Sequence, residues 1–306
     1  MSPSSPSGTG YHMALLIVLG AIWSSSFLFI KIGVESLSPM AIATGRVVIA
    51  AALLFLYMKA CGERLPPWGR SCGRAWGWIF FVGLFGNGVP FTLLGWGEER
   101  IDSGMAAILM AIMPLSTLLL SHVFTTDERL TWPRAAGVSF GLAGVVVLVG
   151  PEALLKLGDD AWRQLAVAGA AFCYASAAVA ARRLPNTSPV SRGAAVQICA
   201  SLQMLPVVLL IDKPWTMEPT AGALLSVLYL GLFPTALATI MLFYLLSLRG
   251  ATYIALNNYL IPVLGVFWGA LFLDELVTLR SLIALALILA GIVIASLKSK
   301  PLIAQP

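Results

Sequence analysis

Two adjacent amides and a proline interrupt an apolar stretch of the chain, YIALNNYLIPVLGVFWGALFLDE (253–275). Asn257 and Asn258 lie one helical turn before Pro262, which has no N–H and therefore leaves the carbonyl of Asn258 without its helical hydrogen bond. An amide both donates and accepts, so it suits the carboxylate and the ammonium group of a zwitterion. We expect Asn257 or Asn258 to contact a polar ligand; the alternative is hydrogen bonding between helices, about 0.6 kcal/mol per contact in a membrane.

Charged residues occur at two further places in apolar runs. Arg46 lies about 10 Å inside the run that begins at Pro39. Charges within a membrane are costly and usually face a cavity or a partner, so Arg46 is either a structural or interface-seeking side chain or a counter-ion for an anionic substrate group. Glu98, Glu99 and Asp102 cluster where another run ends. We expect them to form a solvated rim, and proton coupling is the alternative.

Aromatic side chains complete the candidate binding set. Trp23 lies in GAIWSSSFLFIK (20–31), where the three serines beside it are polar in an otherwise apolar run. Many other aromatic residues are expected at lipid-facing or interfacial positions. The predicted substrate contacts are Trp23, Ser24, Phe27, Arg46, Phe85, Trp96, Tyr229, Asn257 and Asn258.

Other chemistry has little support in the sequence. The segment HVFTTD (122–127) has the His-x4-Asp spacing of some membrane acyltransferases, but their supporting motifs are missing. The four cysteines form no CxxC pair and have no neighbouring histidines, which predicts neither a metal site nor a disulfide. The phosphate-binding pattern GxxxxGK[ST] is absent, so nothing in this chain predicts ATP hydrolysis. We expect a protein without cofactors that is not an enzyme.

Composition defines the elements that must position these residues. The chain is 59% hydrophobic and 11% charged, whereas soluble domains are about 45–50% apolar and about 25% charged. The apolar residues fall in runs of about 20, the length that crosses a bilayer as a helix. The sequence therefore predicts an all-α polytopic membrane protein with ten transmembrane helices: 12–34, 38–60, 74–97, 101–124, 131–151, 162–184, 189–211, 219–248, 251–273 and 277–297.

Basic residues predict the orientation of these helices. With the N-terminus inside, 12 of the 19 basic residues lie in inside loops and tails, whereas 11 of the 14 acidic residues lie outside. This bias predicts that both termini are cytoplasmic. The net charge of +5 is then a topology signal and gives no reason to expect nucleic acid as a partner. The tail 1–11 is rich in Pro, Ser and Gly, and we expect it to be disordered.

The chain repeats itself with an offset of about 150 residues. Pro114 aligns with Pro262, Gly83-Leu84-Phe85 with Gly231-Leu232-Phe233, and Pro39 with Pro189. We therefore expect two five-helix units, 12–151 and 162–297. Since five is odd, the second unit enters the membrane from the opposite side, which gives a 5+5 inverted repeat. Two such halves can exchange conformations to produce alternating access.

These residues also resemble a known family. The segments WSSSFLFIK (23–31), PMAIATGR (39–46) and PVLGVFWGALFLDE (262–275) are similar to EamA-type members of the drug/metabolite transporter superfamily. The resemblance covers 12–297. It implies ten helices in a 5+5 inverted repeat and a central cavity walled by the first, third, fourth, sixth, eighth and ninth spans. It also implies export of amino acids or other small metabolites.

The sequence thus predicts a secondary transporter of the bacterial inner membrane, with a monomer as its functional unit and a small molecule as its substrate. One alternative is a cationic-drug exporter, although the first span has Trp and Ser where such proteins need a membrane-embedded acid. The other alternative is a non-transporting subunit of a membrane assembly, which leaves the inverted repeat unexplained.

Overall fold

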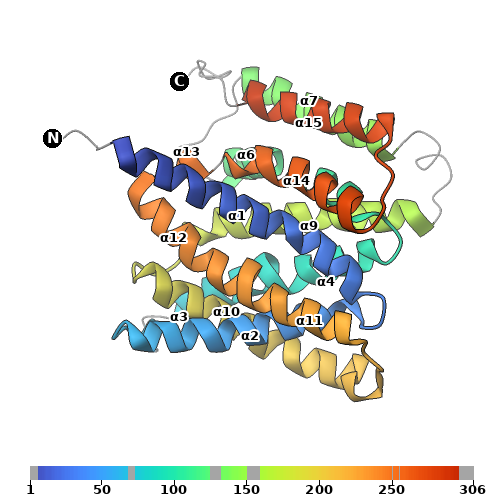
Figure 1. The fold of residues 1–306 in the computed structure, drawn as a ribbon. Coiled ribbons are helices and arrows are strands. Elements are labelled where there is room, and N and C mark those ends of the chain that lie inside the picture. The colour runs from blue at the N-terminus through green and yellow to red at the C-terminus, as the bar shows by residue number, and fades with distance from the viewer. Residues whose placement is uncertain are drawn as a thin grey trace.

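A computed structural model describes residues 6–67, 73–124, 132–149, 159–249, 251–254 and 256–295 (Figure 1). Within these ranges every regular element is a helix. The helices, in chain order, are α1 (Pro6–Gly33), α2 (Pro39–Ala60), α3 (Gly73–Gly83), η2 (Leu84–Gly88), α4 (Val89–Glu98), α5 (Ser103–Met110), α6 (Met113–Phe124), α7 (Trp132–Val149), α9 (Asp159–Ala181), α10 (Pro189–Val207), η3 (Val208–Asp212), η4 (Pro214–Thr216), α11 (Ala221–Leu230), η5 (Gly231–Leu237), α12 (Ala238–Arg249), α13 (Ala251–Ile254), α14 (Asn257–Phe272) and α15 (Leu279–Ala295).

The helical segments are those of a multi-pass integral membrane protein. Seven of them are long and apolar enough to cross a bilayer, and three shorter apolar helices accompany them in the described ranges. The seven are Gly10–Gly33, Pro39–Ala60, Gly73–Glu98, Ser103–Phe124, Ala161–Ala181, Pro189–Asp212 and Ala221–Leu245, and the shorter three are Ala135–Leu148, Asn257–Phe272 and Leu279–Ala295. Each of the ten expected spans overlaps one of these segments, while ten crossings and the inverted repeat stay predictions.

The second helix of each expected half begins in the same way. Ser38 precedes α2 and its hydroxyl accepts a hydrogen bond from the N–H of Ala41. Ser188 precedes α10 and accepts likewise from the N–H of Ser191. A serine cap followed by proline at the first helical position satisfies an N–H that the helix itself leaves unpaired. The two starts are 150 positions apart in the sequence.

Two long spans contain a π-helical turn near their middle. In one span α3 continues through η2 into α4, and in the other α11 continues through η5 into α12. The segment η5 contains Pro234, and the hydroxyl of Thr235 donates to the carbonyl of Leu230, 2.7 Å away. A π turn widens the helix locally and is frequent at functional sites. Pro234 therefore coincides with an irregular turn of this span.

The amide pair of the 253–275 stretch lies at the start of a helix. Pro262 is inside α14, which runs from Asn257 to Phe272. Leu256, just before α14, lies in a turn, and the short helix α13 ends at Ile254. The Asn pair is thus at the first turn of α14.

Helices α7 and α15 form a pair at one edge of the bundle, at the top of Figure 1. They approach so closely that a Cβ atom on Gly137 would lie 2.4 Å from the carbonyl oxygen of Gly291. Small residues permit this kind of contact between membrane helices. The pair lies outside the cavity described below.

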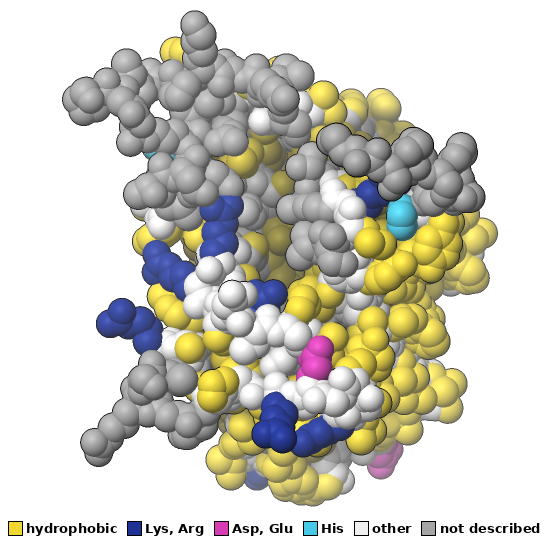
Figure 2. Space-filling model, turned by 90° about the vertical axis from the view of Figure 1, so that its left-hand side faces the viewer, with side chains coloured by type: hydrophobic (Ala, Val, Ile, Leu, Met, Phe, Trp, Pro, Cys, Tyr) yellow, Lys and Arg dark blue, Asp and Glu magenta, His cyan; other side chains and the backbone are white. Residues whose placement is uncertain are grey.

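One end of the bundle is strongly basic. Figure 2 views the side that carries the N-terminal end of α1 and the C-terminal end of α2, and the exposed charged side chains there are mainly Lys and Arg. Exposed basic residues of the loops and helix ends expected inside are Lys59, Arg64, Arg74, Arg182 and Arg183.

Candidate functional site

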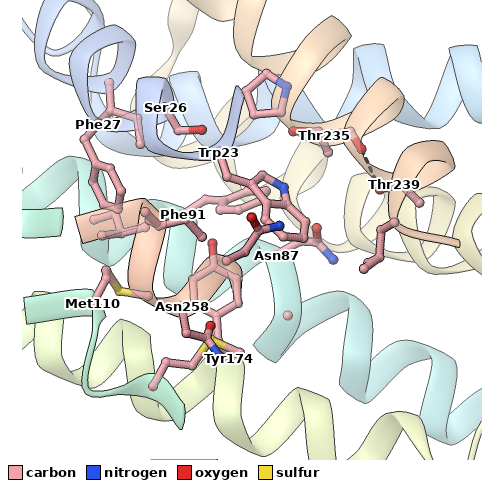
Figure 3. Close-up of a pocket in the computed structure, with 18 of the residues that line it drawn as sticks. Trp23, Ser26, Phe27, Asn87, Phe91, Met110, Tyr174, Thr235, Thr239 and Asn258 are labelled. Carbon is pink, nitrogen blue, oxygen red and sulfur yellow. Dashed lines mark hydrogen bonds between the residues drawn. The ribbon is translucent and has the colours of Figure 1, made fainter. Parts of the chain in front are cut away.

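A cavity of about 530 Å³ lies among the helices of both expected halves (Figure 3). This volume is within the range of about 300–1,000 Å³ that small-molecule sites occupy. Its wall is largely apolar, with a few polar side chains. The lining residues are Trp23, Ser26, Phe27, Ile30, Arg46, Gly86, Asn87, Phe91, Leu94, Met110, Ala111, Met113, Pro114, Tyr174, Gln197, Pro234, Thr235, Thr239, Leu242, Ile254, Asn257, Asn258, Ile261 and Pro262.

Arg46 brings a positive charge to the cavity from α2. Its side chain is only 4% exposed. Both Nε and Nη2 donate to the hydroxyl of Thr235 in η5, each over 3.1 Å, and the guanidinium lies 3.6 Å from the centre of the Phe91 ring. These neutral partners orient the arginine without cancelling its charge, so Arg46 remains able to attract an anionic group.

A second polar contact crosses the cavity wall between α10 and η2. The side-chain N–H of Gln197 donates to the amide oxygen of Asn87 over 2.9 Å. The side-chain oxygen of Gln197 itself, Oε1, is buried and has no hydrogen-bond partner within the described ranges. Gln197 and Asn87 therefore supply neutral hydrogen-bonding capacity on the wall of the cavity.

Asn257 is the most unusual polar residue of the cavity. It is 1% exposed, and neither its Nδ2 nor its Oδ1 has a hydrogen-bond partner among the residues that the structure describes. Its side chain is directed at α1, since a Cβ atom on Gly20 would lie 2.9 Å from Oδ1. Buried amides are almost always hydrogen-bonded, because an unpaired polar group costs about 1–3 kcal/mol. A ligand or water that satisfies Asn257 would remove this cost.

The remaining wall is aromatic and apolar. Trp23 and Phe27 on α1 line the cavity with Phe91 and Tyr174, and Figure 3 shows Asn258 on the same side as Met110 and Tyr174. Ser26 lines the cavity on α1 as well. Such a wall can hold an apolar side chain while the polar groups hold the charged end of a solute.

Five of the nine predicted contacts line this cavity, and their role in binding stays a prediction. They are Trp23, Phe27, Arg46, Asn257 and Asn258.

The other four predicted contacts lie outside the cavity lining. The hydroxyl of Ser24 accepts a hydrogen bond from the indole N–H of Trp268 over 2.9 Å. The Tyr229 hydroxyl is 2.7 Å from that of Ser25. Phe85 stacks on Phe81. Trp96 is 37% exposed and stacks against Arg163. Each of these side chains is engaged in packing between helices or at the surface.

Sequence reasoning missed Asn87, Gln197, Thr235 and Tyr174. The first two are amides in otherwise apolar runs, as Asn257 is, so the same signal could have found them. Thr235 carries no such signal, because a threonine hydroxyl commonly bonds to its own helix. Tyr174 carries none either, because aromatic residues are also common at lipid-facing and interfacial positions.

The acidic cluster at the end of α4 divides into two different environments. Glu99 is at the surface and forms an ion pair with Arg163. Glu98, next to it, is 0% exposed. The expectation of a solvated rim is therefore wrong for Glu98, because α9, α2 and α1 pack against α4.

A multi-helix membrane bundle with a mostly apolar central cavity that holds one arginine and several amides has the form of a membrane transporter. The sequence profile of the EamA-like transporter family matches residues 11–150 and again residues 161–297. The chain belongs to this family.

Relatives across the whole length carry the same description. An uncharacterized transporter of Archaeoglobus fulgidus is 28% identical over 92% of this chain and 96% of its own length. The uncharacterized inner membrane transporter YedA of Escherichia coli K12 is 26% identical over 94% of this chain and 93% of its own. A probable terminal-alkyne amino-acid exporter of Streptantibioticus cattleyicolor is 25% identical over 91% of each chain.

The fold is also similar to that of a crystal structure. That chain superimposes with a TM-score of 0.65 at 22% identity, over 94% of this chain and 97% of its own. At this identity the similarity concerns the fold alone.

Proposed function

We propose that the protein is a secondary transporter that exports amino acids or similar small metabolites by alternating access across the bacterial inner membrane. The observation that carries the proposal is the pairing of Arg46 with the unsatisfied amide of Asn257 in one cavity. Arg46 suits a carboxylate, and the Asn257 side chain can accept from an ammonium group. The name of the Streptantibioticus relative, an amino-acid exporter, points to the same class of solute.

Alternating access by an inverted repeat has support in matched contacts. Gly231 of η5 lies against α2, where a Cβ atom would be 3.2 Å from the carbonyl oxygen of Arg46. Gly83, just before η2, lies against α10, where a Cβ atom would be 3.1 Å from the carbonyl oxygen of Val196. Both pairs match at the repeat offset, so the span with the π turn in each half packs on the second helix of the other half. This is the arrangement that a pseudo-two-fold axis in the membrane would produce.

The basic end of the bundle supports cytoplasmic termini. Lys59, Arg64, Arg74, Arg182 and Arg183 are exposed near helix ends expected on that side, in keeping with the positive-inside rule. The binding site proposed within this topology comprises Trp23, Phe27, Arg46, Asn257 and Asn258. We take a single chain as the functional unit because the cavity is formed between the two halves of one chain.

A cationic-drug exporter fits the cavity less well. The charged side chain that lines it is Arg46, and no acid is among the lining residues in the described part of the chain. A guanidinium in a largely apolar cavity repels a cationic solute.

Transport assays in proteoliposomes with a panel of amino acids test the proposal. We expect saturable transport of at least one zwitterionic amino acid and none of a lipophilic cation dye measured in parallel. Transport of the dye, with every amino acid inert, would contradict the proposal and favour the cationic-drug alternative.

A further inference from the structure

Glu98 is a buried acid that the proposed binding site does not use. It is the last residue of α4 and lies one helical turn beyond Leu94, which lines the cavity. The side chain is 0% exposed, and neither carboxylate oxygen has a hydrogen-bond partner within the described part of the chain. Glu98 thus lies between the cavity and the end of the span that we expect to face away from the cytoplasm.

The nearest groups that could pair with Glu98 are bonded elsewhere. The ammonium group of Lys31 donates to two backbone carbonyl oxygens, those of Glu98 at 2.7 Å and Ile101 at 2.8 Å. It therefore caps the end of α4 instead of binding the carboxylate. Glu275 accepts from the N–H groups of Ser103 at 2.6 Å and Gly104 at 2.9 Å, so this second acid caps the start of α5.

The charged and titratable groups around Glu98 come from each element packed on α4. Lys31 is on α1, Arg46 on α2, and Arg163 with Tyr174 on α9, while η2 carries no charged residue. Asp102 precedes α5, and Glu275 follows α14. Arg163 is paired with Glu99. Lys31, Arg46 and Glu275 are close enough to interact electrostatically with Glu98.

Asp102 shows that this helix end disfavours negative charge. Partial burial raises the pKa of Asp102 above its ordinary value, and the nearby Glu275 carboxylate raises it further, against an opposing effect of Lys31. A carboxylate that is wholly buried, without a donor to either oxygen, is costlier still. One bound proton removes that charge.

We propose that Glu98 is the proton-binding site through which solute export is coupled to inward proton movement. The proton forms an O–H bond with the carboxylate when the outer end is open to water, and closure then buries the neutral acid at the position that Glu98 occupies in the structure. The O–H bond breaks when water from the cavity reaches Glu98, because the positive charge of Arg46 then favours the carboxylate. The proton leaves to that water, on the cytoplasmic side of the closed outer end.

The repeat argues that the acid is not a requirement of the scaffold. At the offset of 148 that aligns Gly83 with Gly231, the counterpart of Glu98 is Leu246. An apolar residue is therefore accepted at the equivalent position of the other half. A buried acid at a position where the fold accepts leucine indicates a role beyond folding.

Proton binding is measurable without any solute, by infrared difference spectroscopy of the reconstituted protein during a pH titration. We expect a carbonyl-stretch band of a protonated carboxylic acid that is present in the wild type, absent in Glu98→Gln and retained in the matched variant Glu99→Gln. Glutamine mimics the neutral acid, so E98Q should fold, and its thermal unfolding provides the check. A band of equal intensity in the wild type and E98Q overturns the proposal.

Coupling rests on the proposed function and is measured with whichever amino acid the wild type exports. Under an inward pH gradient of about one unit, a tenfold ratio of proton activity, export by the wild type and E99Q should accelerate. The export rate of E98Q should be the same with and without the pH gradient, while solute-for-solute exchange continues. Amino-acid transport that is indifferent to the gradient in the wild type, or that follows a sodium gradient instead, overturns this inference and leaves the proposed function standing. If no amino acid moves at all, the proposed function fails, and the infrared result still decides whether Glu98 binds a proton.

Discussion

The two halves of the chain make the same kind of contact with different side chains. In one, Arg46 of α2 reaches Thr235 of η5; in the other, Gln197 of α10 reaches Asn87 of η2. Asn87 and Thr235 are equivalent at the offset of 148. Gln197 lies one residue beyond Val196, the equivalent of Arg46. The fold thus uses a polar donor from the second helix of each half to bind the π turn of the other half.

The difference between the two contacts is a charge. A neutral amide performs this structural role at Gln197, so the guanidinium of Arg46 exceeds what the contact requires. A charge buried within a membrane is expensive to maintain. We infer that the charge of Arg46 acts on a solute, while the hydrogen bond to Thr235 acts on the fold.

A second pair of positions shows the same asymmetry. Leu109 and Asn257 are equivalent at the offset of 148, and both are almost completely buried. Met110 and Asn258 are equivalent too, and both line the cavity. The first half packs apolar side chains where the second half places amides, so the amides are not required for helix packing at these positions.

The largest expected effect tests whether the two halves are inverted. An inverted repeat requires the two five-helix halves to enter the membrane from opposite sides. A reporter that is active only outside the cytoplasm, fused after Pro306, should be silent. The same reporter fused after Ser36, in the connection between α1 and α2, should be fully active. Strong activity at both Pro306 and Ser36 would mean an odd number of crossings and would rule out the inverted repeat, whereas activity at Pro306 alone would reverse the predicted orientation.

Substitution of Arg46 by glutamine makes the two cross-half contacts alike and removes the charge. We expect affinity for a carboxylate-bearing solute to fall by about a hundredfold, since a hydrogen bond to a charged group is worth up to about 3 kcal/mol. The measurement is the concentration dependence of transport in proteoliposomes. Gln197→Leu, which breaks the other contact without a change of charge, should cost only about fivefold, corresponding to about 1 kcal/mol. Equal losses in the two variants would show that Arg46 is structural.

Polar residues within apolar runs predict cavity positions well, whereas aromatic residues do not. A polar residue within an apolar run predicted a cavity position for Arg46, Asn257 and Asn258, and it applied to Asn87 and Gln197 without being used there. Aromatic type predicts facing poorly, because a ring is stable against lipid, protein or ligand alike.

Helix irregularities explain other differences between sequence and structure. Phe85 lies within the π turn η2. The rotation per residue in a π turn differs from that of an α-helix, so α-helical periodicity from Trp76 or Gly83 could not predict the direction of the Phe85 side chain. The burial of Glu98 depends on α9, α2 and α1, which pack on α4 and are distant from it in sequence, so local pattern alone could not predict it.

The difference between the equivalent positions Asn257 and Leu109 can be tested by exchanging their side chains one at a time. Asn257→Leu should fold normally and lower solute affinity by roughly thirtyfold, as expected for two hydrogen bonds of about 1 kcal/mol each. Leu109→Asn places an amide in the packed core of the other half and should reduce the free energy of unfolding by about 1–3 kcal/mol. Thermal unfolding in detergent and transport in vesicles measure the two effects separately. Unchanged transport by Asn257→Leu for every amino acid tested would assign Asn257 to packing.

The smallest expected effect compares two tryptophans that the sequence alone placed in the same class. Trp23 lines the cavity, whereas Trp96 stacks on Arg163 at the surface. Trp23→Ala should weaken binding by about threefold to tenfold, since aromatic contacts contribute about 0.5–1.5 kcal/mol beyond the area they bury. Trp96→Ala removes a similar ring from outside the cavity and should leave the half-saturating solute concentration at its wild-type value. The comparison requires equal amounts of folded protein, measured by size-exclusion profiles of both variants. If Trp23→Ala transports with wild-type affinity, the indole packs the helices together, and the solute is held by the polar groups of the cavity without it.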